Sequence, residues 1–319
     1  MLALLTGLWA GLARLGWDVP LPRPGFSSLH GPLMVSGFLG TLISLERAVA
    51  LGRPWAYAAP LLTGLGGVGL IVGAPILAAQ WLILAGSLGL VAIFAAIIRR
   101  HPALYTFTMG GGAIVWALGN LLWCLGWPVF LVVFWWAAFL VVTIAGERLE
   151  LARLQQVTGA AQATLLLLLG ILLTGLLLLG WSFDGGVRLF GLGLAGLALW
   201  LGRHDIARRT VKQAGLTRFI AICLLTGYVW LGISGLSAMW FGGVPVGPQY
   251  DATLHAFFLG FVFAMIFAHA PIIFPAVLGA RMAYRPLFYA HVVLLQVTLV
   301  VRLIGDAAGW SAGRQVGGL

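Results

Sequence analysis

The chain has 319 residues, of which 61% are hydrophobic and 8% charged, and its mean hydropathy is +1.06. So few charged residues cannot cover a globular surface, so the composition excludes a soluble globular protein. The net charge of +10 does not indicate nucleic-acid binding, because the basic residues stand in short runs between apolar segments. We therefore predict an all-α protein: a single polytopic transmembrane helix bundle over residues 1–319, in contact with the lipid bilayer.

The cysteines and the N-terminus give no sign of secretion or of a zinc site. Cys124 and Cys223 fall in separate apolar segments without CxxC spacing, which signals neither a disulfide nor zinc. We interpret both as small buried hydrophobic residues. The N-terminus lacks a basic region and a small-residue cleavage site, so we expect a first span there rather than a signal peptide.

Glycine, proline and charge clusters divide the chain into apolar segments, most of them near the ~20 residues that a spanning helix needs. The segments are 1–17, 27–48, 56–78, 80–98, 103–126, 128–146, 160–181, 187–202, 216–241, 249–273 and 285–310. The first and eighth are short. The seventh and eighth are rich in Leu and Gly, and we expect them to pack closely. The sequence stops soon after the last segment, and whether a twelfth helix follows stays open. We therefore expect about 11 to 12 spans.

The basic residues favour a cytoplasmic N-terminus under the positive-inside rule. In that orientation the cytoplasmic side holds Arg47, Arg53, Arg99, Arg100, Arg148, Arg153, Arg203, Arg208, Arg209, Lys212, Arg218, Arg281 and Arg285. The outer side holds Arg14, Arg23, Arg188, Arg302 and Arg314. We therefore predict a multi-pass protein of the cytoplasmic, or inner, membrane.

The tenth segment carries two histidines in an otherwise apolar run, where an unpaired polar group is costly. On a helix, His255 and His269 would lie ~21 Å apart in height and within roughly 40° of one face. His30, about a turn into the second segment, matches the depth of His255 at the outer end. His291, about two turns into the eleventh segment, matches the depth of His269 at the inner end. The sequence thus predicts an outer pair and an inner pair of histidines.

Paired imidazoles with no cysteine or carboxylate beside them suit haem iron better than zinc or a bare copper site. We expect His30 and His255 to ligate an outer haem b, and His269 with His291 to ligate a second, inner haem. With both haems present, an edge separation on the order of 10 Å would let electrons cross the membrane. Copper stays open, although the sequence lacks the clustered thiolates or methionines that would argue for it.

Other residues near these histidines have both a haem-related and a simpler interpretation. Met34, a turn below His30, would pack on the ring edge or ligate it, or else fill the core. Arg302 would pair with haem propionates, or else snorkel or pair with Asp306. The glycines that would leave flat space for a macrocycle are Gly31, Gly37, Gly40 and Gly260.

The remaining polar residues of the chain have simpler interpretations. Those at depth, which would line a cavity or join helices by hydrogen bonds, are Asn120, Tyr228 and Gln296. Those expected to form local ion pairs are Glu46 with Arg47 and Glu147 with Arg148. The two other histidines, expected to be solvated in basic loops, are His101 and His204.

The run HGPLMVSGF, with His30, Met34, Gly37 and Phe38, resembles the HxxxMxxGF pattern near the start of the NnrS family. The run HAFFLGFVFAMIFAHAP is similar in style to that family's later histidine-containing helix. The resemblance covers these two motifs and the overall topology. It implies a membrane protein of about a dozen helices that contains haem and copper and is associated with nitric oxide metabolism and resistance to nitrosative stress.

A more distant resemblance is to the catalytic subunit of haem-copper oxidases and nitric oxide reductases, in which histidines on helices two and ten hold a low-spin haem. His30 and His255 stand in the corresponding segments. The helix-ten ligands of that subunit form an HxH pair, whereas position 257 here is Phe. The sixth and seventh segments have no histidine for copper or non-haem iron. A binuclear reductase centre is therefore not supported, and only the electron-carrying part of that architecture remains.

We therefore predict a haem-b-binding membrane protein of NnrS-like type, acting in the nitric oxide response or in electron transfer between a quinone and an outer redox partner. Whether it is an enzyme stays open. The alternative is a cofactor-free transporter or channel in which the histidines are proton relays or substrate ligands. The stretches GAP at 73–75 and HAP at 269–271 hint at broken helices, but the halves show no inverted repeat. A third interpretation is a structural subunit of a respiratory complex.

Overall fold

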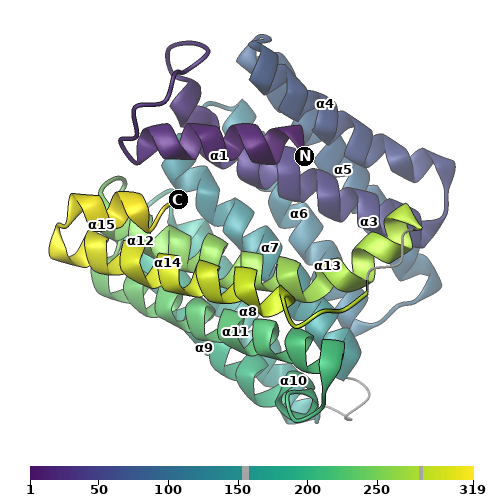
Figure 1. The fold of residues 1–319 in the computed structure, drawn as a ribbon. Helices are drawn as coiled ribbons and strands as arrows, with labels where there is room; N and C mark the ends of the chain where they lie inside the picture. The colour runs from purple at the N-terminus through teal and green to yellow at the C-terminus, as the bar shows by residue number, and fades with distance from the viewer. Residues whose placement is uncertain (153–157, 280–282) are drawn as a thin grey trace. The chain divides into compact units, whose positions relative to one another are not determined.

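The computed structural model describes residues 1–152, 158–279 and 283–319. Arg153 and Arg281, which we assigned to cytoplasmic loops, lie outside the described residues. Within those three stretches the chain is helical and has no strand, which confirms the predicted all-α class (Figure 1). The helices form two compact units, Met1–Gly146 and Glu147–Leu319, here called unit 1 and unit 2.

Among the described residues, 10 helices are long and apolar enough to cross a membrane. This agrees with a polytopic membrane protein and lies close to the predicted number of spans. The predicted first span is shorter than expected: α1 covers only Leu2–Arg14, below the ~20 residues that a spanning helix needs. The predicted eighth segment is longer than expected and forms a full span, Phe183–His204.

Unit 1 begins with α1 and a second span made of several consecutive helical pieces. These pieces are a 3-10 turn (Phe26–Leu29), α2 (His30–Pro32), a π-helical segment (Leu33–Gly40) and α3 (Thr41–Leu51). The helices that follow are α4 (Ala58–Val72), α5 (Ile76–Arg100), α6 (Leu104–Cys124) and α7 (Val129–Ala152), whose last turns belong to unit 2.

Unit 2 contains the rest of the helices, and one of its spans again includes a π-helical segment. The helices are α8 (Gly159–Leu178), α9 (Phe183–His204), α10 (Ala207–Thr210), α11 (Gly215–Phe241), α12 (Pro248–His255), α13 (Phe263–Leu278), α14 (Phe288–Ala308) and α15 (Ser311–Val316). The π-helical segment Ala256–Val262 joins α12 to α13 without a break.

Glycine and proline set the helix ends more sharply than hydropathy does. We expected the third segment to run to residue 78, but α4 ends at Val72 because Gly73 adopts a left-handed conformation, with φ 85°. Pro75 then starts α5. A left-handed glycine is a common helix end, and a proline restricts the residue before it, so both residues stop the helix here.

Small residues allow the helices of unit 2 to approach closely, as expected for the seventh and eighth segments. A Cβ added to Gly175 of α8 would lie 2.4 Å from the backbone nitrogen of Phe190 in α9. A Cβ on Gly235 of α11 would lie 2.5 Å from the backbone nitrogen of Ala195 in α9. Any side chain at these positions would push the backbones apart, so glycine fixes the α8, α9 and α11 packing.

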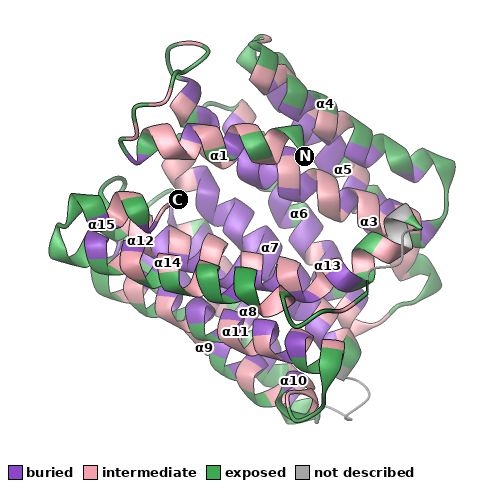
Figure 2. Ribbon diagram, in the orientation of Figure 1, coloured by how far each residue is buried: buried purple, intermediate pink, exposed green. Residues whose placement is uncertain are grey.

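The core of unit 1 lies along α6 and α7, and α7 is buried along most of its length (Figure 2). Trp116 of α6 stacks on Phe139 of α7 with ring centroids 4.9 Å apart. Asn120 Oδ1 accepts hydrogen bonds from Trp136 Nε1 at 3.0 Å and from Ser36 Oγ at 3.2 Å. Asn120 therefore joins helices, which is one of the two roles expected for it.

Candidate functional site

His30 is the first residue of α2, the short helix before the π-helical segment of unit 1. Pro32 has no N–H to donate and its ring crowds the preceding turn, so the regular hydrogen-bond register is lost there and a wide turn follows. His30 Nδ1 lies 2.8 Å from the carbonyl oxygen of Gly7 in α1. A carbonyl only accepts, so Nδ1 carries the proton and the lone pair of the neutral ring is on Nε2.

The glycines of α1 are what allow this contact. A Cβ on Gly11 would lie 2.9 Å from Cε1 and Nδ1 of the His30 ring. The missing side chain therefore provides the room in which the imidazole lies against α1. Met34, on the next turn, packs with its sulfur against Gly7, and its side chain is buried. Met34 thus has the core role that was its simpler interpretation.

His255 ends α12, and the π-helical segment of unit 2 follows it directly. Its Nδ1 lies 2.8 Å from the carbonyl oxygen of Asp251, one turn back, and 3.2 Å from Asp251 Oδ1. Both atoms accept, so Nδ1 again carries the proton and Nε2 the lone pair of the neutral ring. His30 and His255 therefore share the same tautomer, and each lies shortly before a π-helical segment.

Arg302 of α14 lies beside the His255 ring but is not in line with the Nε2 lone pair. Its Nη2 is 3.3 Å from Nε2 and 3.4 Å from Nδ1. A donor in line with the lone pair would be much farther from Nδ1 than from Nε2, so this near-equality excludes an aligned hydrogen bond. Arg302 is instead fixed by Asp251, whose Oδ2 accepts from Nη2 at 2.8 Å and from Nε at 3.2 Å.

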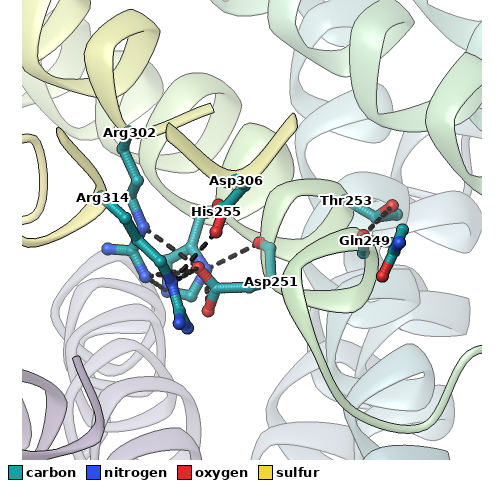
Figure 3. A network of polar contacts seen from close by, with 7 residues as sticks. All are labelled: Gln249, Asp251, Thr253, His255, Arg302, Asp306 and Arg314. Atoms are coloured by element: carbon teal, nitrogen blue, oxygen red, sulfur yellow. Dashed lines mark hydrogen bonds and ion pairs between the residues drawn. The ribbon is translucent and has the colours of Figure 1, made fainter. Parts of the chain in front are cut away.

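Two further charged residues complete this group, which we call the His255 network (Figure 3). Arg314 of α15 lies with Nε 3.0 Å from Asp306 Oδ1 and 3.9 Å from Asp251 Oδ2. Our interpretation that Arg302 pairs with Asp306 was therefore wrong: Asp306 pairs with Arg314 and Arg302 with Asp251. The members of the network are Asp251, His255, Arg302, Asp306 and Arg314.

The return of the chain from α14 into α15 explains how Arg302 and Arg314 come together. A Cβ on Gly305 would lie 2.5 Å from the backbone nitrogen of Arg314, and one on Gly317 would lie 2.4 Å from that of Arg302. Gly309, with φ 66°, ends α14 in the left-handed region. Glycine at these positions lets α15 fold back against α14 and bring both cations to Asp251.

His269 of α13 belongs to a second buried group, the His269 network, formed by Arg148, Asp205, Tyr228 and His269. His269 Nδ1 donates to the carbonyl oxygen of Met265 at 2.6 Å, and Nε2 accepts from Arg148 Nη2 at 2.9 Å. Arg148 Nε lies 3.9 Å from Asp205 Oδ2. Arg148 is 5% exposed and Asp205 is 4% exposed, so the ion pair is buried.

Asp205 is held by two further donors. Tyr228 Oη donates to Asp205 Oδ2 at 2.6 Å, and the backbone nitrogen of Ala207 donates to Oδ1 at 2.7 Å. The sequence analysis missed Asp205, because RHDIARR looks like a solvated basic loop. A lone carboxylate among arginines directly after an apolar span is the signal that could have found it.

The inner pair of histidines is not brought together by these contacts. His291 of α14 packs its ring against Phe267, with centroids 4.5 Å apart, and its side chain is exposed. Positions 267 and 269 lie roughly 160° apart around a helix. His269 faces Arg148 on one side of α13, and His291 meets the other side.

Of the four glycines expected to leave space for a macrocycle, two face a tryptophan ring, and a Cβ on Gly37 would lie 3.2 Å from Ala3 Cβ. A Cβ on Gly40 would lie 2.1 Å from the Trp116 ring, and one on Gly260 would lie 2.4 Å from the Trp230 ring. Gly31 is open by comparison, with its nearest atom 3.7 Å away. Gly31, beside His30, is therefore the least crowded of the four.

The other predicted polar residues take structural roles. Gln296 Oε1 accepts from Trp230 Nε1, which joins α14 to α11. Glu46 lies 3.7 Å from Arg47 as a local ion pair. His101 is exposed, whereas His204 packs on Trp200, with Nδ1 3.0 Å from its carbonyl oxygen. Over the described residues, no three His, Cys, Asp or Glu side chains form a group that could hold a metal ion.

Comparison with known proteins adds a family but no characterised relative. No curated protein and no solved structure matches the chain. One family model covers it from end to end, residues 1–319. The chain therefore belongs to the family described as Domain of unknown function (DUF8744).

Proposed function

We propose that this multi-pass protein of the cytoplasmic membrane binds haem b through His30 and His255. The observation that carries the proposal is their shared geometry: each has Nδ1 held by a backbone carbonyl, which leaves the lone pair on Nε2. Ligating histidines in metal sites usually donate their other N–H in this way. Each also lies within three residues of the start of a π-helical segment, a feature frequent at functional sites.

The charges beside His255 also suit a haem. Arg302 is 5% exposed, and Arg314 lies on the same aspartate. Haem propionates are carboxylates, and arginine pairs with carboxylates through a planar fork of donors. Because Arg302 is out of line with Nε2, its position does not compete with a ligand there. The resemblance to the NnrS family points in the same direction.

The bound haem would supply one-electron chemistry. The chain's own residues would hold the two imidazoles in one tautomer and place arginines beside the propionates. On this basis we propose a role in the nitric oxide response or in electron transfer with a membrane quinone. The proposal does not extend to an inner haem, because His269 Nε2 accepts from Arg148 and His291 packs on Phe267.

The test is the iron content and the reduced absorption spectrum of the purified full-length protein. We expect iron in the preparation and a b-type band. His30→Ala and His255→Ala should each lower the haem content at least about tenfold, since ~1.4 kcal/mol of lost binding already gives that factor. His101→Ala is the matched control and should keep the haem. An iron-free wild type, or equal loss in the control, would overturn the proposal.

A second candidate function is a cofactor-free transporter or channel, favoured by the two charged networks of unit 2. One network contains His255 and the other His269, ~21 Å apart along the same helix. Ionisable residues within spans often mark ion or proton pathways. Flux of protons into proteoliposomes by an iron-free protein, abolished in His255→Ala and His269→Ala, would support this candidate over the haem protein.

A further inference from the structure

An aromatic cluster surrounds His291 where α14 begins. Its other members are Phe219, Phe267, Tyr284, Phe288 and Tyr289. Phe219 is fully buried and meets the rings of Phe288 and Tyr289 at centroid distances of 5.8 and 5.3 Å. The ring centroid of His291 lies 4.5 Å from that of Phe267, 6.1 Å from that of Phe219 and 6.2 Å from that of Phe288. Three aromatic side chains therefore hold the imidazole in place.

The imidazole itself is exposed and lacks a polar partner. His291 is exposed, and only 22% of the apolar stretch of its span is buried. Within residues 1–152, 158–279 and 283–319, neither ring nitrogen of His291 has a hydrogen-bond partner. A polar group on the lipid-facing side of a span is costly unless something satisfies it. The molecule that does so must come from the membrane or its interface.

The surroundings restrict the chemistry of that molecule. It must reach the site through lipid, so most of its surface is apolar. It must lie against aromatic rings, which favours a planar ring. It must also offer a hydrogen-bonding group to an imidazole, which a carbonyl or hydroxyl oxygen does. His291 is the fourth residue of α14, so the site lies near one end of the span.

We propose that the aromatic cluster with His291 binds the headgroup of a membrane quinone or quinol. A quinone has carbonyl oxygens that accept from the imidazole N–H, and a quinol has hydroxyls that donate to its lone pair. Both have a planar ring for the aromatic side chains and a hydrocarbon tail for the lipid. A role for the quinone as an electron partner rests on the proposed haem function, whereas quinone binding at this site does not.

The experiment uses the full-length protein in phosphatidylcholine nanodiscs with a photoreactive azidoquinone that carries a short alkyl tail. After illumination, mass spectrometry should find the label on the peptide that contains Phe288 and His291. Excess decylubiquinone should protect that peptide. His291→Phe keeps a flat apolar ring but removes the hydrogen bond, and it should lower the protected labelling about tenfold, a loss of ~1.4 kcal/mol.

Two matched variants separate binding from folding. His291→Gln keeps a hydrogen-bonding side chain and should recover part of the labelling. His101→Phe, in an exposed loop, should label like the wild type. Labelling that decylubiquinone does not reduce, or that is unchanged in His291→Phe, would overturn the proposal. Protection by phosphatidylglycerol in place of decylubiquinone would identify a phospholipid site and would also overturn it.

The same preparations distinguish this proposal from the haem proposal. A wild-type protein that is labelled but contains no haem would contradict only the proposed function. A wild-type protein with a b-type spectrum and no protected labelling would contradict only the quinone site.

Discussion

The helix formed by α12, the π-helical segment and α13 carries a histidine near each end, and the two surroundings differ in one respect. Both imidazoles donate from Nδ1 to the carbonyl one turn back, at 2.8 Å for His255 and 2.6 Å for His269. Both also have an arginine beside them. At His269 the arginine is within an ordinary hydrogen bond of Nε2, 2.9 Å, whereas at His255 it is 3.3–3.4 Å from both ring nitrogens.

Under the haem proposal, this difference separates a histidine held for structure from one that binds a ligand. The His269 network uses Nε2 for an internal hydrogen bond, and the aspartate behind Arg148 has its own donors. In the His255 network, Asp251 holds Arg302. The guanidinium therefore does not lie along the direction of the His255 Nε2 lone pair. The same three residue types thus place the arginine on the imidazole Nε2 at one end and beside the imidazole ring at the other.

The largest expected effect comes from removing the arginine of the His269 network. Arg148→Ala leaves the buried carboxylate of Asp205 without its cation, which should destabilise the protein by roughly 3–5 kcal/mol. Unfolding in SDS, followed by tryptophan fluorescence, measures the loss. Asp184→Asn, in an exposed pair with Arg188, is the control and should cause little change. An Arg148→Ala variant as stable as the control would show that the His269 network is not a structural unit.

Removing the arginine of the other network should cost less. In Arg302→Ala, Asp251 keeps His255 Nδ1 at 3.2 Å and Arg314 at 3.9 Å, so its charge is not left alone. We expect a loss of about 1.5–3 kcal/mol, the range for a hydrogen bond to a charged group. The measurement is the same SDS unfolding, on haem-free protein. A loss larger than that of Arg148→Ala would reverse the comparison between the two networks.

The sequence allowed the spans to be predicted but not these networks. Apolar runs locate helices because burial in lipid depends on composition, and the breaks at Gly73 and Pro75 shifted only the ends. Arg148 and His269 are 121 positions apart, and no local pattern links them. We assigned Arg148 to its neighbour Glu147, because a single sequence shows only neighbours along the chain.

The π-helical segments were missed for a related reason. In the sequence, Pro32 stands where a first helical turn would tolerate a proline, but the chain is already helical before it and loses its register there. The second π-helical segment has no proline. Its Gly260 accommodates Trp230, a tertiary contact that hydropathy does not show. That His30 and His255 lie near the start of their spans could be predicted from the sequence, but their hydrogen-bond partners could not.

The stretch between the two networks can be tested through Gly260. In Gly260→Ala the new Cβ would lie 2.4 Å from the Trp230 ring, which is also bound to Gln296. Because that ring cannot move freely, we expect overpacking to cost about 1–2 kcal/mol. Gly170→Ala, where no atom lies within 4 Å, is the control and should be neutral or slightly stabilising. Equal stability of the two variants would mean that Trp230 does not fix the π-helical segment.

The smallest expected effect concerns His291 of unit 2, which lies in neither network. Its side chain is exposed and makes ring contacts alone among the described residues, so His291→Phe should change the free energy of unfolding by less than about 0.5 kcal/mol. The measurement is SDS unfolding without added quinone. A change of the size expected for Arg148→Ala would mean that His291 supports the fold, and a loss of quinone labelling in this variant would then have a structural cause. A negligible change combined with lost labelling would instead assign the imidazole to a ligand.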